Sequence, residues 1–219
     1  MLERLIHIDN ELLLMLNGMH LPYLDNFMML FTGRFVWVPM YAMLLFVIIR
    51  NNRPKRAVWT ACVIVLAIVI ADQTCSHVLR PLVERLRPSN PSNPISELVT
   101  VVNGYRGGLY GFPSCHAANS FALAMITSLI VRSRRLSWFI FIWATLNSYS
   151  RLYLGVHYPG DLLAGAVIGC CSGALCYALW RGVSREKAQP DKIKGRLRSS
   201  DLVIISGLLV TAVIAAASI

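Results

Sequence analysis

Long apolar stretches are the feature of this sequence that most constrains its fold. A helix rises about 1.5 Å per residue and the hydrocarbon core of a bilayer is about 30 Å thick, so roughly 20 apolar residues span it. Six candidate stretches occur, of which the third and fourth are short: Phe27–Ile49, Ala57–Leu79, Ala117–Val131, Leu136–Tyr149, Leu162–Trp180 and Leu202–Ile219. With 56% hydrophobic and 15% charged residues, the chain has more apolar surface than a soluble core of this length would need. We therefore predict an all-α, polytopic membrane protein with six transmembrane helices.

The first residues differ from these stretches. Met1–Gly18 mixes Glu3, Asp9 and Glu11 with leucines, and it lacks the basic start and small-residue cleavage site of a signal peptide. It predicts an amphipathic helix that lies on the bilayer surface. We expect residues 1–219 to form a single domain whose last helix is Leu202–Ile219.

Cysteines give no sign of a metal site or a disulfide framework. Five of the six lie inside the apolar stretches, and none shows the spacing of metal ligands. We expect these five to be small packing residues: Cys62, Cys75, Cys170, Cys171 and Cys176.

The basic residues predict the orientation of the chain. Fourteen of the 21 lysines and arginines fall in Arg50–Arg56, Arg132–Arg135 and Arg181–Arg198, which alternation of the helices places on one side. Because cytoplasmic loops are rich in Lys and Arg, that side is predicted to be the cytoplasm. Both termini and the Arg80–Phe112 loop then face outward. The net charge of +10 is explained by these basic loops, with anionic lipid headgroups as a secondary partner. A nucleic-acid partner is not expected, because the basic residues are divided among short loops and form no folded basic domain.

Several arginines nevertheless fall on the outward side. Arg80, Arg85 and Arg87 cluster in RPLVERLRP, and Arg151 lies at another outward helix end. Such residues also occur as interfacial arginines that pair with lipid phosphates or, here, with Glu84. Polar residues in two other outward segments favour a functional site over this interfacial role.

One of these segments is GFPSCHAANSF. Ser114 follows a proline and precedes an apolar helix, so it is predicted to be the N-cap, with His116 in the first turn. A helix start presents unpaired N–H groups and a partial positive charge, which together favour an anion. Taken singly, His116 would more often be an interfacial histidine.

The other segment is SRLYLGVHYPGD. Pro159 and Gly160 predict a turn at His157, and Asp161 is predicted to cap the following helix. Asp161 would then hydrogen-bond one imidazole nitrogen and leave the other free to attack or to transfer a proton. The alternative is an aspartate that only caps and a histidine that anchors at headgroup level.

The three segments together resemble a known family. RPLVERLRP, PSCH and SRLYLGVHYPGD are similar, in order and spacing, to the motifs KxxxxxxRP, PSGH and SRxxxxxHxxxD of the type-2 phosphatidic acid phosphatase superfamily. Its members include membrane lipid phosphatases and diphosphatases, glucose-6-phosphatase and vanadium haloperoxidases. The motifs cover residues 80–161, and the flanking helices resemble the membrane branch.

The resemblance implies a role for each matching residue. His157 would be the nucleophile that takes the phosphoryl group, Asp161 would orient it, and His116 would protonate the leaving oxygen and then activate water. The phosphate would be held by a set of five residues: Arg80, Arg87, Ser114, Cys115 and Arg151. Arg85 and Arg106 are candidates for headgroup contacts. Fixed positive charges would stabilise a phosphoryl transition state without a metal or other cofactor.

The chain departs from the family pattern at two positions. Arg80 stands where the family usually has Lys, which keeps the charge and adds a bidentate donor. Cys115 stands where the family usually has Gly; its N–H remains, but its side chain would approach the phosphate. A reactive thiolate is one reading of Cys115, and simple tolerance is the one we favour.

The resemblance leaves the substrate open. Polyprenyl diphosphates, lipid A phosphates, phosphatidylglycerophosphate and phosphatidic acid are all candidates for hydrolysis at the outer face, in a bacterium the periplasmic face of the inner membrane. A soluble phosphate ester fits less well, and haloperoxidase chemistry least. The alternative from another class is a non-catalytic protein that binds or transports an anionic lipid or phosphate. A binder would have no need for an ordered His–Asp pair and a second histidine.

Overall fold

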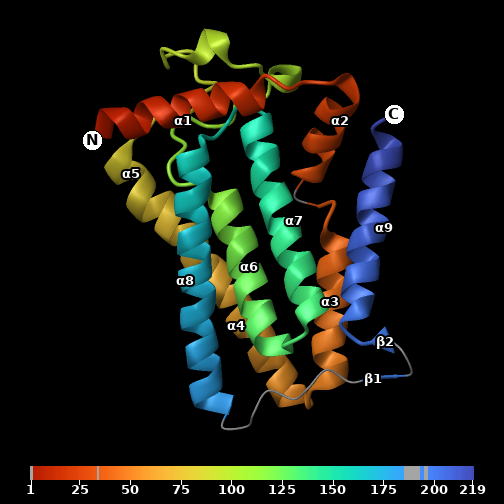
Figure 1. Cartoon of the computed structure of the whole chain (residues 1–219). Coiled ribbons are helices and arrows are strands. Elements are labelled where there is room, and N and C mark those ends of the chain that lie inside the picture. The colour runs from red at the N-terminus through yellow and green to blue at the C-terminus, as the bar shows by residue number, and fades with distance from the viewer. Residues whose placement is uncertain (1, 34, 185–192, 195–196) are drawn as a thin grey trace.

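In the computed structural model, described here for residues 2–33, 35–184, 193–194 and 197–219, helices dominate the chain. The long apolar helices run side by side along one bundle axis (Figure 1). The α-helices are α1 (Leu2–Asn17), α2 (Pro22–Phe31), α3 (Val38–Asn51), α4 (Pro54–Gln73), α5 (Arg80–Val83), α6 (Cys115–Val131), α7 (Arg134–Tyr153), α8 (Pro159–Ser184) and α9 (Asp201–Ala217). The shorter elements are the π-helix Thr74–Leu79, the 3₁₀ turns Ser96–Leu98 and Val102–Gly104, and the antiparallel strands β1 (Ile193–Lys194) and β2 (Leu197–Arg198).

A tight interface between α6 and α8 forms the centre of the bundle. Gly165, Gly169 and Gly173 repeat every four residues along α8 and face the backbone of α6. A Cβ atom added at Gly169 would lie 2.2 Å from the carbonyl oxygen of Ala118, so only glycine permits this approach. Such small-residue stripes let helices pack closely where the hydrophobic effect between them is weak. The interface holds the first turns of α6 and α8 at a fixed separation.

The two ends of the bundle differ in charge. The link between α3 and α4, the turn between α6 and α7 and the end of α8 lie at one end, and α1 and the loop before α6 lie at the other (Figure 1). The basic segments Arg50–Arg56 and Arg132–Arg135 therefore share the end opposite α1. Most of the third basic segment, Arg181–Arg198, lies outside the described residues. The described part of the chain thus matches the predicted alternation.

Two of the predicted helices have different bounds. The stretch Phe27–Ile49 was predicted as one helix and is broken between Phe31 and Val38. The indole Nε1 of Trp37 donates to the carbonyl oxygen of Phe31 at 2.8 Å, which satisfies a backbone group that the break exposes. The prediction that Leu136–Tyr149 forms a short helix is also wrong, because α7 has 20 residues. Hydropathy ended that stretch before Arg151, which is buried inside the helix instead.

The helices differ in whether their length and composition suffice to cross a membrane. Among the described residues, Pro54–Val83 and Pro159–Val183 are long and apolar enough to cross a bilayer, with 30 and 25 residues. The helices α3, α6 and α9 are apolar but shorter. Two spans thus follow from length and composition alone, and the count of six stays a prediction.

The helix α1 lies across one end of the bundle, crosswise to α6, α7 and α8 (Figure 1). Leu13 and Asn17 are buried against the fold, and Leu5, Leu12 and Met15 are exposed. At its end, the amide nitrogen of Asn17 donates to the carbonyl oxygens of Thr100 and Tyr153 at 3.1 and 2.8 Å. These contacts seat α1 against the loop before α6 and the end of α7.

Candidate active site

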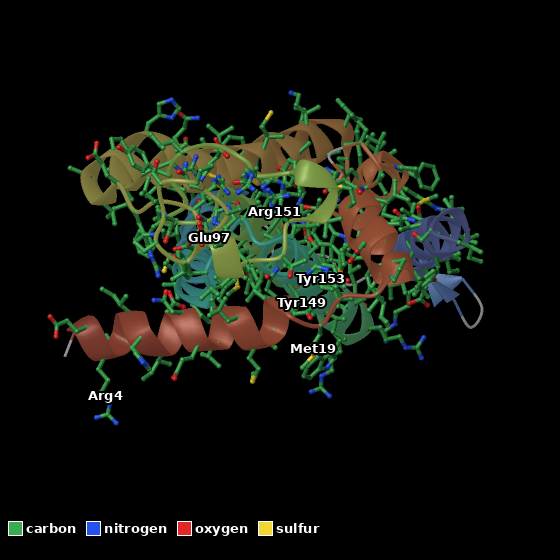
Figure 2. All side chains as sticks on the ribbon, turned by 90° about the horizontal axis from the view of Figure 1, so that it is seen from above. Arg4, Met19, Glu97, Tyr149, Arg151 and Tyr153 are labelled. Carbon is green, nitrogen blue, oxygen red and sulfur yellow. The ribbon has the colours of Figure 1, made fainter. Side chains whose placement is uncertain are left out.

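The three motif segments meet at the α1 end of the bundle. The backbone N–H of Ser114, just before α6, donates to the carbonyl oxygen of Asp161 in α8 at 3.0 Å. The segment that carries Arg85 and Arg87 lies in the same region, because the N–H of Gly111, three residues before Ser114, donates to the carbonyl oxygen of Arg85 at 2.8 Å. Seen from this end, Arg151 lies near the centre of the bundle, whereas Arg4 points away from it (Figure 2). Segments far apart in the sequence therefore bring their polar side chains to one place.

His157 and Asp161 form the pair that their spacing predicts. Nδ1 of the imidazole lies 3.3 Å from Oδ2 of Asp161, and both side chains are almost completely buried. The same carboxylate oxygen accepts from the backbone N–H of Tyr158 at 3.0 Å. The absence of a side chain at Gly111 makes room for the pair, because a Cβ there would lie 3.0 Å from Oδ2.

Asp161 is not the N-cap of α8 as predicted. The helix begins at Pro159, so Asp161 is its third residue and reaches back to the N–H of Tyr158. Proline is favoured at the first helical position because its missing N–H would be unpaired there in any case. Pro159 therefore starts the helix, while His157 lies in the turn before it as predicted.

The other imidazole nitrogen faces an arginine. Nη1 of Arg87 donates to Nε2 of His157 at 2.9 Å and to the carbonyl oxygen of Val156 at 3.0 Å. Nε2 is then the unprotonated nitrogen, and Nδ1 carries the hydrogen that points to Asp161. Burial lowers the pKa of His157 well below its ordinary value, and the charge of Arg87 lowers it further. The imidazole is therefore neutral at neutral pH.

Arg87 itself is buried among positive charges. Burial lowers the pKa of its guanidinium to about 10, and the nearby Arg151 and Arg80 lower it in the same direction. The group remains positive at neutral pH. Three guanidinium groups held this close together favour an anion between them.

Arg151 and Arg80 have partners for only part of their guanidinium groups. Arg151 donates to the hydroxyls of Thr32 and Tyr105 at 3.1 and 2.9 Å. Arg80 donates through Nη2 to the carbonyl oxygen of Pro113 at 3.2 Å. In the described part of the chain, Nε of Arg80, Arg87 and Arg151 is buried in each case and has no hydrogen-bond partner. A buried donor without a partner is costly, so three in one place indicate a site for an oxyanion.

The second motif forms the start of α6. Ser114 is the N-cap as predicted, and its hydroxyl accepts from the N–H of Ala117 at 3.5 Å. His116 lies in the first turn and lines a cavity that continues into the bundle. Arg80 contacts this helix start through the carbonyl oxygen of Pro113 and the sulfur of Cys115, so its charge lies beside the first N–H groups of α6.

The unusual Cys115 contacts both an arginine and a second cysteine. Nη2 of Arg80 donates to its sulfur at 3.0 Å, and the thiol of Cys75 hydrogen-bonds it from the π-helix. Both cysteines are free thiols. The Cys115 side chain thus occupies one N–H of Arg80 that a glycine would leave available.

Arg85 and Arg106 make contacts within the protein. Nη1 of Arg85 pairs with Oδ1 of Asp161 at 3.1 Å, and Nη2 pairs with Oδ2 of Asp9 at 2.7 Å. Arg106 donates to the carbonyl oxygen of Ser89. Arg85 thus supports Asp161 from the side opposite His157, and its pairing leaves less of it for a lipid headgroup.

Asp9 is a site residue that sequence reasoning missed. Besides its pair with Arg85, its Oδ1 accepts from the N–H of Gly160 at 2.7 Å, which ties α1 to the start of α8. A carboxylate in an amphipathic helix carries no signal of this contact, because its partner is 151 residues away in sequence.

A second missed group lies deeper, in the cavity that His116 lines. Asp72 and Asn119 are hydrogen-bonded to each other there, at 2.9 Å. A carboxylate inside the apolar stretch Ala57–Leu79 was a signal that could have found it, since ionisable residues at such positions are usually functional. Across the described residues, no group of three or more His, Cys, Asp or Glu side chains is placed to hold a metal ion.

The arrangement suits the transfer of a phosphoryl group. An unprotonated imidazole nitrogen stands beside three arginines with unpaired N–H groups, and a carboxylate holds the far side of the ring. The second histidine, His116, lines a cavity from the start of α6 together with Cys115 and Thr32, which contact Arg80 and Arg151. These are the parts that covalent catalysis at phosphorus needs: a nucleophile, a cationic cradle and a proton donor.

Comparison with known proteins also indicates a phosphatase. The model of the PAP2 superfamily matches residues 61–185, which include all three motifs. A lipid A 4′-phosphatase of Bacteroides thetaiotaomicron is 50% identical over 97% of this chain and 96% of its own length. Another, of Porphyromonas gingivalis, is 35% identical over 82% of this chain and 75% of its own length.

Among solved structures, a transmembrane PAP2-type phosphatidylglycerolphosphate phosphatase from Bacillus subtilis shares the fold. Its TM-score is 0.58, at 18% identity over 85% of this chain and 90% of that one. The architecture of the helices therefore matches a membrane phosphatase.

Proposed function

This chain belongs to the PAP2 superfamily, and on that premise we propose that it removes a phosphate from a membrane glycolipid of the lipid A type. The chain is a membrane lipid phosphatase, and its 50% identity to a lipid A 4′-phosphatase over nearly the full length of both chains favours that substrate class. Polyprenyl diphosphates are the second candidate. The roles of the site residues, the topology and the side of the membrane are part of the proposal.

The first step is attack on phosphorus by Nε2 of His157. A P–N bond forms, the bond from phosphorus to the ester oxygen of the lipid breaks, and His116 donates a proton to that oxygen. In the second step His116 takes a proton from water, the resulting hydroxide attacks phosphorus, and the P–N bond breaks. Inorganic phosphate leaves, and His157 is again neutral at Nε2. Asp161 holds the ring and stabilises the positive charge that it acquires.

The positive groups act on the oxygens of the phosphoryl group. Charge spreads over these oxygens in the transition state, and donors fixed before the reaction stabilise it without reorganising. We assign this role to Arg80, Arg87 and Arg151, with the N-cap Ser114 and the N–H of Cys115. One observation carries the proposal: Arg87 donates to the unprotonated nitrogen of the buried His157, and the Nε groups of Arg87 and of the nearby Arg80 and Arg151 are buried without partners among the described residues.

The proposed placement has six spans in one domain of residues 1–219, with α1 on the membrane surface. The exposed Leu5, Leu12 and Met15 of α1 support contact with lipid. The basic segments at the opposite end support a cytoplasmic location for that end. The site then faces the outer side, which is the periplasm if the protein lies in a bacterial inner membrane.

A panel of substrates tests the proposal. Purified protein in detergent is given lipid A, undecaprenyl diphosphate, phosphatidylglycerophosphate and phosphatidic acid, and the release of inorganic phosphate is measured. We expect the highest kcat/KM on lipid A and none with His157→Ala. Release from the diphosphate alone would support the second candidate. No release from any of the four would support the non-catalytic binder instead.

The leaving-group role of His116 has its own test. A substrate with a good leaving group needs less help from an acid, so His116→Ala should impair an aryl phosphate less than an alkyl phosphate. Equal losses on both esters would contradict that role.

A further inference from the structure

A cavity continues from His116 into the bundle between α3, α4, α6 and α7. Its volume is about 790 Å³, and its deeper walls are apolar, with Leu44, Ile64 and Leu123 among them. Four polar side chains line it close to the histidine: Asp72, Asn119, Ser120 and Asn147. None of the four belongs to the motifs or to the proposed chemistry.

These polar side chains form two hydrogen-bonded pairs. The amide nitrogen of Asn119 donates to Oδ1 of Asp72 at 2.9 Å. The amide nitrogen of Asn147 donates to the hydroxyl of Ser120 at 2.7 Å. We call these four residues the polar shelf. The pairs join α4 to α6 and α6 to α7, so the shelf is held by three of the helices that line the cavity.

Each amide on the shelf has an acceptor to spare. The carbonyl oxygens Oδ1 of Asn119 and Asn147 are buried, and neither has a hydrogen-bond partner among the described residues. One N–H of each amide is already used, and the two shelf atoms that have no partner at all among the described residues are these acceptors. The side chain of Asn147 is itself only 7% exposed. Buried acceptors without partners favour a ligand that brings O–H or N–H donors.

The negative charge of the polar shelf disfavours an anionic ligand. Asp72 adds a carboxylate beside Asn119, and the described lining of the cavity near it contains no arginine or lysine. A second phosphate placed there would face a carboxylate and two carbonyl oxygens. A hydroxylated or amide-bearing ring would instead satisfy both acceptors.

From this arrangement we propose that the polar shelf binds the hydroxyl and amide groups of a sugar ring between the phosphate and the hydrocarbon of the substrate. The inference rests on the proposed function and deepens it. Asn119 follows His116 by three residues, which is about 4.5 Å along a helix, close to the width of one ring. The order along the cavity is then phosphate, sugar and acyl chains. A lipid diphosphate would place its inner phosphate on the shelf instead.

Two variants test the shelf, Asn119→Leu and Asn147→Leu, which keep the branched shape of the side chain and remove the amide with its acceptor. Asn26→Leu is the matched control, because Asn26 lies on α2 outside the cavity lining. Each protein is assayed for phosphate release from lipid A and for inhibition of that release by orthovanadate, which probes the phosphate site alone. Folding is checked by the thermal unfolding midpoint in detergent.

We expect both shelf variants to lose at least about tenfold in kcat/KM on lipid A, since a substrate donor without its acceptor discriminates strongly. The inhibition constant for vanadate should stay within about twofold of the wild type, because the arginine cradle, formed by Arg80, Arg87 and Arg151, is intact. The control should match the wild type in both.

Two results would overturn the inference while leaving the proposed function standing. One is full activity of both shelf variants on lipid A. The other is a rise in the vanadate inhibition constant equal to the loss in kcat/KM, which would mean that the variants disturb the phosphate site. Failure of the wild type to hydrolyse lipid A would instead overturn the proposed function, and the shelf with it.

Discussion

Arg87 and His157 share a buried hydrogen bond in which Nη1 of the arginine donates to Nε2 of the imidazole at 2.9 Å. The bond fixes the ring tautomer from one side, and Asp161 fixes it from the other. It also places a positive charge next to the atom that we propose attacks phosphorus. A phosphate entering the site would accept from Arg87 in place of the imidazole and leave Nε2 free to react.

The lowered pKa of His157 predicts how stability depends on pH. An unfolded histidine has a pKa of about 6.5, and burial places the folded value well below it. Between these two values the unfolded state binds more protons, so stability falls as pH falls below about 6.5. The thermal unfolding midpoint in detergent, measured from pH 8 to 5, should drop less for His157→Gln than for the wild type. Identical slopes for the two proteins would contradict a buried neutral imidazole.

The contact between Asp9 and Arg85 predicts that α1 supports the site from a distance. Asp9→Asn removes one charge that holds Arg85, so Asp161 is less firmly oriented. We expect kcat to fall about tenfold with KM changed little, because a misplaced nucleophile costs rate more than binding. Glu11→Gln is the control, since Glu11 lies on the same helix and is exposed beside His7. Equal kinetics for the two variants would show that α1 has no such role.

Replacing Cys115 by glycine should preserve or raise activity, whereas most active-site substitutions lower it. Its sulfur accepts from Nη2 of Arg80, so Cys115→Gly frees a donor for the phosphate. We expect kcat/KM to be equal to or up to about threefold above the wild type, with a loss of stability below about 1 kcal/mol from the glycine. Cys171→Ser, at an exposed position, is the control. An inactive Cys115→Gly protein would mean that the thiol takes part in the reaction.

The arginine cradle predicts that no added metal ion is needed. Three guanidinium groups supply the positive charge that a phosphoryl transition state requires. Phosphate release should therefore be unchanged in excess chelator and inhibited by vanadate. Loss of activity in chelator that Mg²⁺ restores would overturn this expectation.

The parts of the site that could be predicted from the sequence depend on local rules. Ser114 as an N-cap and His157 in a turn follow from residues within four positions of them, and the spacing of His157 and Asp161 places the two side chains together. The family motifs added the arginines, which lie far apart in the sequence. The N-cap prediction for Asp161 was wrong because Pro159 starts the helix two residues earlier.

What the sequence could not predict depends on contacts between distant segments. Arg85 pairs with Asp9 and Asp161, which only the docking of α1 across the bundle brings together. The length of α7 was underestimated because a charged residue such as Arg151 usually marks the end of an apolar helix. Here Arg151 stays within the helix because its guanidinium group donates to the hydroxyls of Tyr105 and Thr32. The break before Val38 likewise depends on a tertiary setting for Trp37, in the core beside Trp143.

The central claim is that His157 carries the phosphoryl group, and trapping that intermediate tests it most directly. His116→Ala should slow hydrolysis of the P–N bond, whereas an aryl phosphate can still transfer its phosphoryl group because its leaving group needs little help from an acid. An aryl phosphate labelled with ³²P should therefore leave label on this variant when the reaction is quenched in alkali within the first turnover. Phosphohistidine survives alkali, and peptide mapping should place the label on the segment that contains His157. The double variant His116→Ala, His157→Ala should carry none. Label on another residue, or equal label with and without His157, would contradict the account.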